Sequence, residues 1–450
     1  MSFPADFVFG VATSAYQIEG AARQDGKGES IWDRFVREPG RIRDDATGDI
    51  ACDHYHRWRE DVELMASLGV NAYRFSIAWT RVLPDGDGRV NPAGLGFYDA
   101  LVDALLENGI DPWVTLYHWD LPQALQERGG WPVRATVDAF VDYAELMAGA
   151  LGDRVTNWIT QNEPWVAAML GHRAGVFAPG LRDWGAALAA GHHLLLSHGK
   201  AVEAIRANAA GARVGIAIDC RPNRAASQAP ADVAAARHFD GFRNRWFFDP
   251  VFGKGYPQDM LAAYRNAGRI LVEPAFVRSG DLETIATPID FLGLNYYTSL
   301  AIRAGGEESE DTGVAPGTAP PPGYTEMGWE VTPDALGDFL RRIRDDYAPR
   351  SIVITENGAS YSDPPGRDGI IRDQRRIAYL QAHLEQLEVA RTAGVPVDGY
   401  FVWSLLDNFE WALGYSQQFG LVGVDRDSLE RIPKQSFGFY RDFIAAQPEG

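Results

Sequence analysis

The chain of 450 residues carries 42 Lys and Arg against 61 Asp and Glu, which gives a formal net charge of −19. Such an acidic protein repels the phosphates of nucleic acids and of anionic membranes, so neutral small molecules are the expected partners. The apolar fraction of 46% is ordinary for a globular protein, and no apolar run reaches the length of a membrane span.

Only two cysteines are present, Cys52 and Cys220, which is too few for a disulfide scaffold. The opening residues lack the basic stretch and the long apolar stretch of a secretory signal peptide. We therefore expect a reduced, cytoplasmic protein without nucleic-acid or membrane partners.

Eight short β-rich runs follow one another along the chain, at residues 7–16, 71–77, 112–118, 155–161, 213–219, 290–296, 351–355 and 398–403. Helical composition follows these runs, and apolar residues recur at three- and four-residue spacing in residues 95–108, 135–151, 184–209, 333–347 and 372–392. This alternation is typical of a parallel sheet wrapped by helices, and eight such units close a barrel. The predicted fold class is therefore α/β, a single (β/α)₈ TIM barrel.

One stretch rich in Gly, Pro and acidic residues, 303–323, falls between the sixth predicted strand and the next helix. Barrels carry their variable βα loops at this place, so we interpret the stretch as an insertion and not as a linker between domains. No internal repeat or second folding unit is evident. The prediction is one catalytic domain over residues 1–450 with elaborated βα loops.

Polar and aromatic residues gather where the predicted strands end, which is where barrel enzymes build their active sites. A strand end is also where a chain turns into solvent, so any one of these side chains could be an ordinary surface residue. Together they indicate a site: Gln17, Arg74, His118, Asn162, Glu163, Asn295, Tyr297, Glu356 and Trp403.

Two of these residues are glutamates that could cleave a glycosidic bond. Glu163 ends the fourth strand before Pro164, and Glu356 ends the seventh before the turn signal Asn357-Gly358. Glycoside cleavage needs a proton donor and a second carboxylate, ~5–5.5 Å apart when the second group attacks the sugar directly. Because the two glutamates are far apart in sequence, a closed barrel is required to bring them to one cavity.

From about residue 7 to 440 the chain resembles family 1 glycoside hydrolases. The residues that carry the resemblance are 7–17 (FVFGVATSAYQ), 73–76 (YRFS), 117–122 (YHWDLP), 162–164 (NEP), 293–297 (GLNYY), 355–358 (TENG), Trp403, Ser404, Asn408, Phe409, Glu410, Trp411 and 419–421 (FGL). The resemblance implies a retaining exo-β-glycosidase, a β-glucosidase, that works by double displacement through a covalent glycosyl-enzyme. Its substrates would be β-glucosides and short β-linked gluco-oligosaccharides such as cellobiose.

The resemblance also assigns roles to individual residues. It makes Glu163 the acid/base and Glu356 the nucleophile, with Arg74, Tyr297 and Asn295 beside them. It implies a sugar-binding set of Gln17, His118, Trp119, Asn162, Trp403, Glu410, Trp411 and Phe419, and it places Trp165, Leu170 and Trp329 in the outer site for the leaving group.

These roles agree with the chemistry of a pyranose, whose hydroxyl groups need polar partners and whose apolar face needs an aromatic platform. Arg74 beside Glu356 is expected to hold that carboxyl ionised. The charge of Glu356 is expected in turn to raise the pKa of Glu163 above its ordinary value of ~4.3. A charged Glu410 is expected to repel a 6-phosphate group and so to select non-phosphorylated sugars.

Three alternatives remain open at this point. The enzyme could act broadly as a β-glucosidase, β-galactosidase and β-fucosidase, or it could transfer the sugar to another acceptor. A different class, a non-catalytic sugar-binding barrel, is disfavoured by the presence of both glutamates. The sequence leaves open whether the chain forms a homo-oligomer.

Metal and cofactor sites are not predicted. Cys52, Asp53, His54 and His56 lack a second group with the paired spacing of a zinc site, and the histidines at 192, 193 and 198 miss the i, i+4 geometry of a helical site. No glycine-rich phosphate loop, dinucleotide fingerprint or serine-nucleophile motif is present. Gln161 has two open interpretations: a polar contact in the barrel wall, or a hydrogen bond that tunes the acid.

Overall fold

A computed structural model describes residues 1–271, 274–305 and 322–448. Eight parallel strands close into a barrel in the order β1-β2-β3-β4-β5-β7-β9-β10, with β10 beside β1. They are β1 (Val8–Ala12), β2 (Ala72–Ser76), β3 (Asp111–Tyr117), β4 (Asn157–Asn162), β5 (Arg213–Cys220), β7 (Phe291–Tyr296), β9 (Ile352–Asn357) and β10 (Val397–Trp403). The predicted (β/α)₈ barrel is confirmed.

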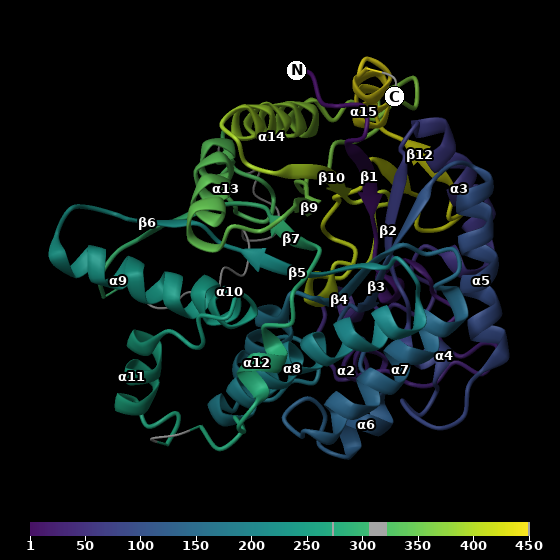
Figure 1. Cartoon of the computed structure of the whole chain (residues 1–450). Helices are drawn as coiled ribbons and strands as arrows, with labels where there is room; N and C mark the ends of the chain where they lie inside the picture. The colour runs from purple at the N-terminus through teal and green to yellow at the C-terminus, as the bar shows by residue number, and fades with distance from the viewer. Residues whose placement is uncertain (272–273, 306–321, 449–450) are drawn as a thin grey trace.

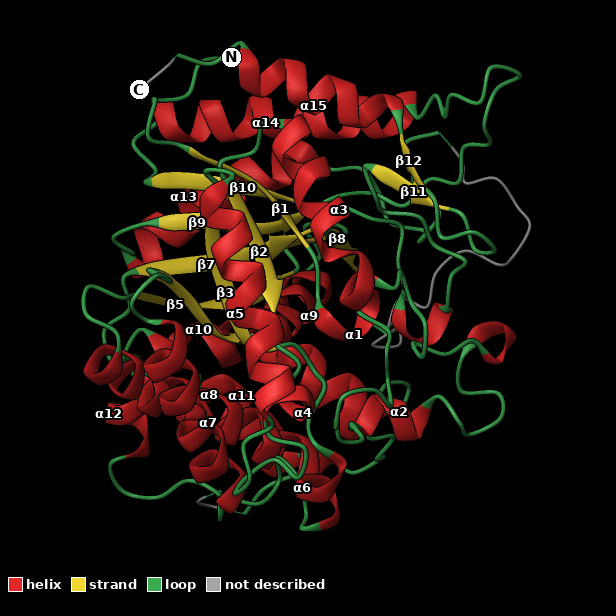
Figure 2. Ribbon diagram, turned by 90° about the vertical axis from the view of Figure 1, so that its right-hand side faces the viewer, coloured by secondary structure: helices red, strands yellow, loops and turns green. Residues whose placement is uncertain are grey.

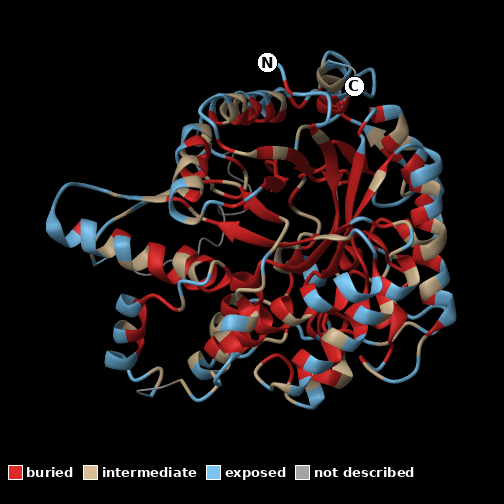
Figure 3. Ribbon diagram, in the orientation of Figure 1, coloured by how far each residue is buried: buried red, intermediate tan, exposed pale blue. Residues whose placement is uncertain are grey.

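Helices surround the barrel on its outside (Figures 1 and 2). The longer ones are α3 (His54–Leu68), α5 (Pro92–Glu107), α7 (Ala135–Leu151), α8 (Trp184–Asn208), α13 (Pro333–Tyr347), α14 (Gln374–Thr392) and α15 (Gln435–Ala445). Short helices occupy the connections: α1 (Ala15–Ile18), α2 (Ile31–Phe35), η1 (Arg43–Asp45), α4 (Trp79–Val82), α6 (Gln123–Glu127), η2 (Val166–Ala174) and η4 (Trp411–Leu413). Their inner faces are buried and their outer faces exposed (Figure 3), as amphipathic helices on a barrel require.

The first predicted strand, 7–16, is too long. The strand ladder ends where Thr13 N donates to Arg74 O at 3.0 Å. Ala15 N then donates to the side-chain oxygen of Ser76 at 2.7 Å, and the helix α1 begins. Tyr16 and Gln17 therefore lie on a helical turn above the barrel, because a side chain of the neighbouring strand takes the next backbone donor.

The connection between β5 and β7 is longer and more structured than the sequence indicated. It contains β6 (Asn223–Ala225), α9 (Pro230–Asp240), η3 (Gly241–Arg245), α10 (Trp246–Val251), α11 (Gln258–Asn266) and α12 (Asp281–Ile285), and α9, α10 and α11 extend to the side of the barrel in Figure 1. The strand β6 pairs with β8 (Leu300–Ile302), which follows β7. Most of the predicted insertion 303–323 lies outside the described residues.

Near the chain end, β11 (Val422–Val424) and β12 (Arg431–Pro433) form a separate antiparallel pair. No helix in the described part of the chain is long and apolar enough to cross a membrane. Cys52 and Cys220 are both free and buried.

Large apolar side chains fill the lower part of the barrel interior. The ring of Trp113 packs against those of Phe291 and Phe401 at centroid distances of 5.0 and 5.2 Å. Space for these rings depends on two strand glycines: a Cβ on Gly10 would lie 2.3 Å from Phe401, and one on Gly215 would lie 2.5 Å from Phe291. This packed layer closes the barrel from below and leaves the carboxyl ends of the strands for a site.

Candidate active site

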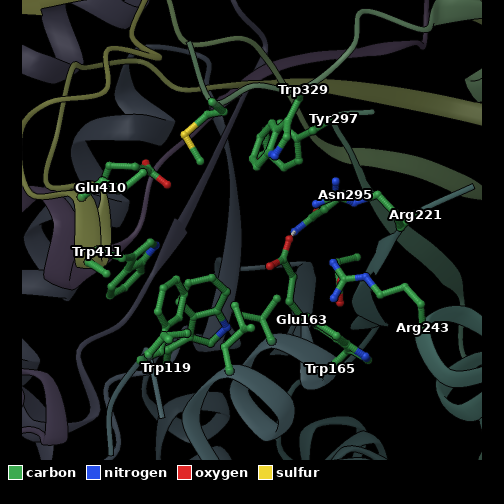
Figure 4. A pocket seen from close by; sticks show the side chains of 18 of the residues that line it. Trp119, Glu163, Trp165, Arg221, Arg243, Asn295, Tyr297, Trp329, Glu410 and Trp411 are labelled. Carbon is green, nitrogen blue, oxygen red and sulfur yellow. Dashed lines mark hydrogen bonds and ion pairs between the residues drawn. The ribbon is translucent and has the colours of Figure 1, made fainter. Parts of the chain in front are cut away.

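A cavity of about 480 Å³ opens at the carboxyl ends of the barrel strands. It is lined by most of the residues that the sequence singled out: His118, Trp119, Glu163, Trp165, Leu170, Asn295, Tyr297, Trp329, Glu356, Trp403, Glu410, Trp411 and Phe419. Gln17, Arg74 and Asn162 lie behind this lining and contact it through hydrogen bonds. The structure thus brings the predicted residues together in one place (Figure 4).

Glu356, in β9, is held from two sides. Arg74 Nη1 donates to its Oε1 at 2.6 Å, and the Tyr297 hydroxyl donates to its Oε2 at 2.6 Å. Burial raises the pKa of Glu356, whereas Arg74 and Tyr297 oppose this by favouring the ionised form. The carboxylate is therefore fixed in orientation, with both oxygens engaged.

Glu163 directly follows β4 and has a left-handed backbone with φ of 50°. Its N–H donates to Ala217 O in β5 at 2.8 Å, and Asn295 Nδ2 donates to its Oε1 at 2.8 Å. A positive φ outside glycine costs energy, and such conformations cluster at functional sites. Here the turn at Glu163 ends β4, and the side chain of Glu163 enters the cavity.

The pKa of Glu163 is raised well above its ordinary value, in the direction that the sequence analysis expected. The cause was only partly anticipated. Burial is the largest contribution, the charge of Asp219 comes next, and the charge of Glu356 follows. Because the cavity walls limit access of water, desolvation outweighs the repulsion between the two carboxyls.

Asn162 links the two glutamates indirectly, through Arg74 and Asn295. Its Oδ1 accepts from Arg74 Nη2 at 2.6 Å and from Asn295 Nδ2 at 3.0 Å. With its oxygen so placed, Asn162 Nδ2 faces His118 Nε2 at 3.2 Å. Burial and the charge of Arg74 lower the pKa of His118 well below its ordinary value, so the imidazole is neutral and accepts this hydrogen bond at Nε2.

Glu410 lies on the opposite wall of the cavity, and Gln17 lies behind it. Gln17 Nε2 donates to Asn408 Oδ1 at 3.0 Å and to Phe409 O at 2.9 Å, and lies 3.5 Å from Glu410 Oε2. Burial raises the pKa of Glu410 to about 8. The charge expected from the sequence is therefore weakened near neutral pH and develops as the pH rises through that value.

Aromatic rings line the inner part of the cavity. His118 stacks on Trp403 and on Trp411 at 5.8 and 5.9 Å, and Trp119 packs on Trp411 at 4.6 Å. Phe419 closes the same side near Tyr297, at 6.0 Å. These flat surfaces beside hydrogen-bonding groups fit the two kinds of surface that a sugar ring presents.

Trp165, Leu170 and Trp329, which the resemblance assigns to an outer site, line the same cavity. Trp165 lies under the guanidinium of Arg243, 3.4 Å from ring centroid to Cζ, and Arg221 lies 5.3 Å over Trp329. Both arginines, together with Asp219, were missed by the sequence analysis. Asp219 ends the fifth predicted strand, so the strand-end rule could have found it, whereas no motif marks Arg243.

Gln161 is explained by its partner: its Nε2 donates to Ser197 Oγ in α8 at 2.8 Å. It is thus a polar contact in the barrel wall, the first of the two interpretations.

The residues with a superficial likeness to metal ligands have separate partners. His54 contacts Asp61, and Cys52 Sγ contacts Asp407 O. His192, His193 and His198 contact Asp281, Trp131 O and Thr160, respectively. No group of three or more His, Cys, Asp or Glu that could hold a metal ion occurs among residues 1–271, 274–305 and 322–448.

Two buried carboxyl groups that share one sugar-sized cavity, one with a raised pKa and the other held by an arginine and a tyrosine, define the class of glycoside-cleaving barrel enzymes. The family model for glycosyl hydrolase family 1 matches residues 1–449, and the chain belongs to this family. The resemblance seen in the sequence is thereby confirmed.

Relatives of known type agree over the full length. The chain is 46% identical to beta-glucosidase A of Acetivibrio thermocellus, over 99% of this chain and 98% of the relative. It is 45% identical to a bifunctional beta-D-glucosidase/beta-D-fucosidase of Bifidobacterium breve, over 99% and 98%. The solved structure of the beta-glucosidase from Thermotoga maritima in complex with glucoimidazole is similar with a TM-score of 0.91 at 44% identity, covering 99% of each chain.

Proposed function

We propose that this family 1 glycosyl hydrolase is a retaining exo-β-glucosidase and that residues 1–450 act as one catalytic domain. It hydrolyses terminal, non-reducing β-D-glucosyl residues from β-glucosides and from short β-linked gluco-oligosaccharides such as cellobiose. The observation that carries this proposal is the different environment of two carboxyls in one cavity: Glu356 bonded to Arg74 and Tyr297, and Glu163 buried beside other negative charge.

In the first half of the reaction, Glu163 donates its proton to the glycosidic oxygen while Glu356 attacks the anomeric carbon. The bond to the leaving group breaks with its electron pair, and a covalent glycosyl-enzyme forms on Glu356. The raised pKa of Glu163 keeps it protonated for this step, and the Arg74 guanidinium favours the ionised form of Glu356 against the effect of burial.

In the second half, water replaces the leaving group. Esterification has removed the charge of Glu356, so Glu163 no longer feels that repulsion, and as a carboxylate it takes a proton from the attacking water. The water oxygen bonds to the anomeric carbon and Glu356 leaves as a carboxylate. Two displacements give net retention of the β configuration.

The test is hydrolysis of an aryl β-glucoside, followed by proton NMR of the first sugar released. We expect the β anomer first, and a crystal structure with the two carboxyl groups ~5–5.5 Å apart. Release of the α anomer, or a separation near ~8 Å or more, contradicts the retaining mechanism.

A second candidate is broad glycosidase activity, since one relative is named a bifunctional beta-D-glucosidase/beta-D-fucosidase. The ratio of kcat/KM for β-glucoside, β-galactoside and β-fucoside decides it. Adding an alcohol acceptor and identifying the products separates hydrolysis from transfer. The complete absence of turnover on all three would indicate the non-catalytic sugar-binding barrel.

A further inference from the structure

A buried ion pair, Asp219 and Arg243, lies beside Glu163. Asp219 is in β5 and Arg243 in η3, and Arg243 Nη2 lies 2.5 Å from Asp219 Oδ2. Their exposed fractions are 4% and 7%, and both residues line the same cavity as Glu163. In Figure 4 the guanidinium of Arg243 lies next to Glu163 and Trp165.

The strand geometry explains why Asp219 is close to the acid/base. Ala217 accepts the N–H of Glu163 and belongs to the apolar interior of the barrel. Asp219 comes two residues later in the same strand, so its side chain points to the same face, one level higher. Asp219 is also in register with Asn295, whose amide donates to Glu163.

The charges of this pair are poorly screened. Asp219 Oδ1 and Arg243 Nη1 are buried without a hydrogen-bond partner in the described part of the chain. Buried charges are screened less than exposed ones, so they act over a longer range.

The other ionisable groups around Glu163 come from several elements. Glu356 in β9 lies across the cavity with Arg74 from β2, Tyr297 follows β7, and Glu410 lies on the opposite wall. Cys220 and Arg221 follow Asp219 in the chain and line the same cavity. Among these and the Asp219–Arg243 pair, Asp219 and then Glu356 raise the pKa of Glu163, and Arg243 lowers it.

Glu356 and Asp219 differ in what happens to them during the reaction. The charge of Glu356 is lost when the sugar esterifies it, whereas Asp219 takes part in no bond making. Burial raises the pKa of Asp219, and the charges of Arg243 and Arg221 oppose this by favouring its carboxylate form. Of the two negative charges near Glu163, that of Glu356 therefore changes during the reaction, whereas that of Asp219 stays constant.

We propose that the Asp219–Arg243 pair places a lasting negative charge beside the acid/base, Glu163. Arg243 holds the Asp219 carboxyl in position, and the negative charge of Asp219 helps Glu163 to hold a proton in both halves of the reaction. This inference rests on the proposed function of Glu163. Without the pair, Glu163 would be protonated less often in the free enzyme, and it would be a weaker base toward water in the glycosyl-enzyme.

The test is Asp219→Asn, which keeps the size of the side chain and removes its charge. We expect the alkaline limb of kcat/KM for an aryl β-glucoside to move ~1 pH unit lower, the size of shift that a neighbouring charge produces. The acid limb, which reports Glu356, should stay in place. Arg243→Lys, which conserves the charge, should keep the wild-type profile.

Asp281→Asn is the matched control. Asp281 is also a buried aspartate paired with an arginine, Arg134, but it lies in α12 and not in the cavity lining. It should leave both limbs unchanged. In a Glu163→Gln background, adding Asp219→Asn should have no further effect on the pH profile, because the group on which the charge acts is gone.

An unchanged alkaline limb in folded, active Asp219→Asn overturns the inference but leaves the proposed function intact, whereas a wild-type enzyme without activity on β-glucosides refutes the proposed function itself. If Asp219→Asn does not fold, Asp219→Ser carries the test: the alkaline limb should again move to lower pH, because the negative charge beside Glu163 is lost. No movement, or movement to higher pH, contradicts the inference.

Discussion

The two halves of the barrel interior are built from the same strands but differ in chemistry. In the lower half, Trp113, Phe291 and Phe401 pack ring against ring in a cluster of apolar side chains. In the upper half, Arg74, Glu356 and Glu163 are buried with their hydrogen-bond partners.

The packing of the lower half affects the pKa values of the carboxyl groups in the upper half. The aromatic layer keeps water out from below, so the carboxyls above it are desolvated and the pKa values of Glu163 and Glu356 are both raised. Their hydrogen-bond partners and neighbouring charges differ: Glu356 is paired with Arg74, whereas Glu163 has the amide of Asn295 and the carboxyl of Asp219 nearby. The predictions below test this difference, starting with the largest effect.

Glu356→Ala should lower kcat by on the order of 10⁴–10⁶-fold, the range seen when a nucleophile is removed from an enzyme. Azide should restore turnover by attacking from the vacated face and give the α-glycosyl azide, identified by NMR. The matched control is Glu385→Ala, the same change on the exposed face of α14, which should behave as wild type. Formation of the β-glycosyl azide would assign Glu356 to the acid/base role instead.

Glu163→Gln should lower kcat/KM by roughly 10²–10⁴-fold for substrates with poor leaving groups, which need protonation. Substrates with good leaving groups should be affected less, and their alkaline limb should flatten. In wild type, activity rises as Glu356 loses its proton and falls as Glu163 loses its own, whose pKa is raised. An alkaline limb that persists in Glu163→Gln would show that another group is the acid.

Trp113→Ala should lower the free energy of unfolding by ~3–5 kcal/mol, since it leaves a cavity in the aromatic layer. Denaturant titration followed by circular dichroism measures this. The control is Ile50→Ala, at a side chain that is 60% exposed, for which a change within about 0.5 kcal/mol is expected. A loss for Trp113→Ala no larger than that of the control would show that the layer does not stabilise the barrel.

Glu410 should discriminate against 6-phosphoglucosides increasingly at higher pH. Its pKa is raised to about 8, so the carboxylate forms as the pH rises through that value. Between about pH 7 and pH 9 the phosphate is already ionised, and the ratio of kcat/KM for glucoside over 6-phosphoglucoside should increase about tenfold, or ~1.4 kcal/mol. Glu410→Gln should make the ratio independent of pH. Faster hydrolysis of the 6-phosphoglucoside by wild type contradicts the assignment.

Much of the site could be predicted from the sequence because barrel strands end on the same face. Glu163 and Glu356 each follow a strand and precede a turn, and a parallel barrel brings such residues together. The first strand shows where prediction from the sequence fails. The pattern predicts a strand to residue 16, but the hydroxyl of Ser76, in the neighbouring strand β2, accepts the N–H of Ala15 and ends the ladder earlier. No local pattern records such a contact.

The sequence by itself determined the alternation of strands and helices, the barrel, the family and the two glutamates, because hydrophobic periodicity and motif spacing are local properties. Only the tertiary structure decided why Glu163 holds its proton. Burial and the Asp219–Arg243 pair depend on which side chains the closed barrel places beside one another and on how much water it excludes. Electrostatic energies follow distances and desolvation in space, and neither can be read along a chain.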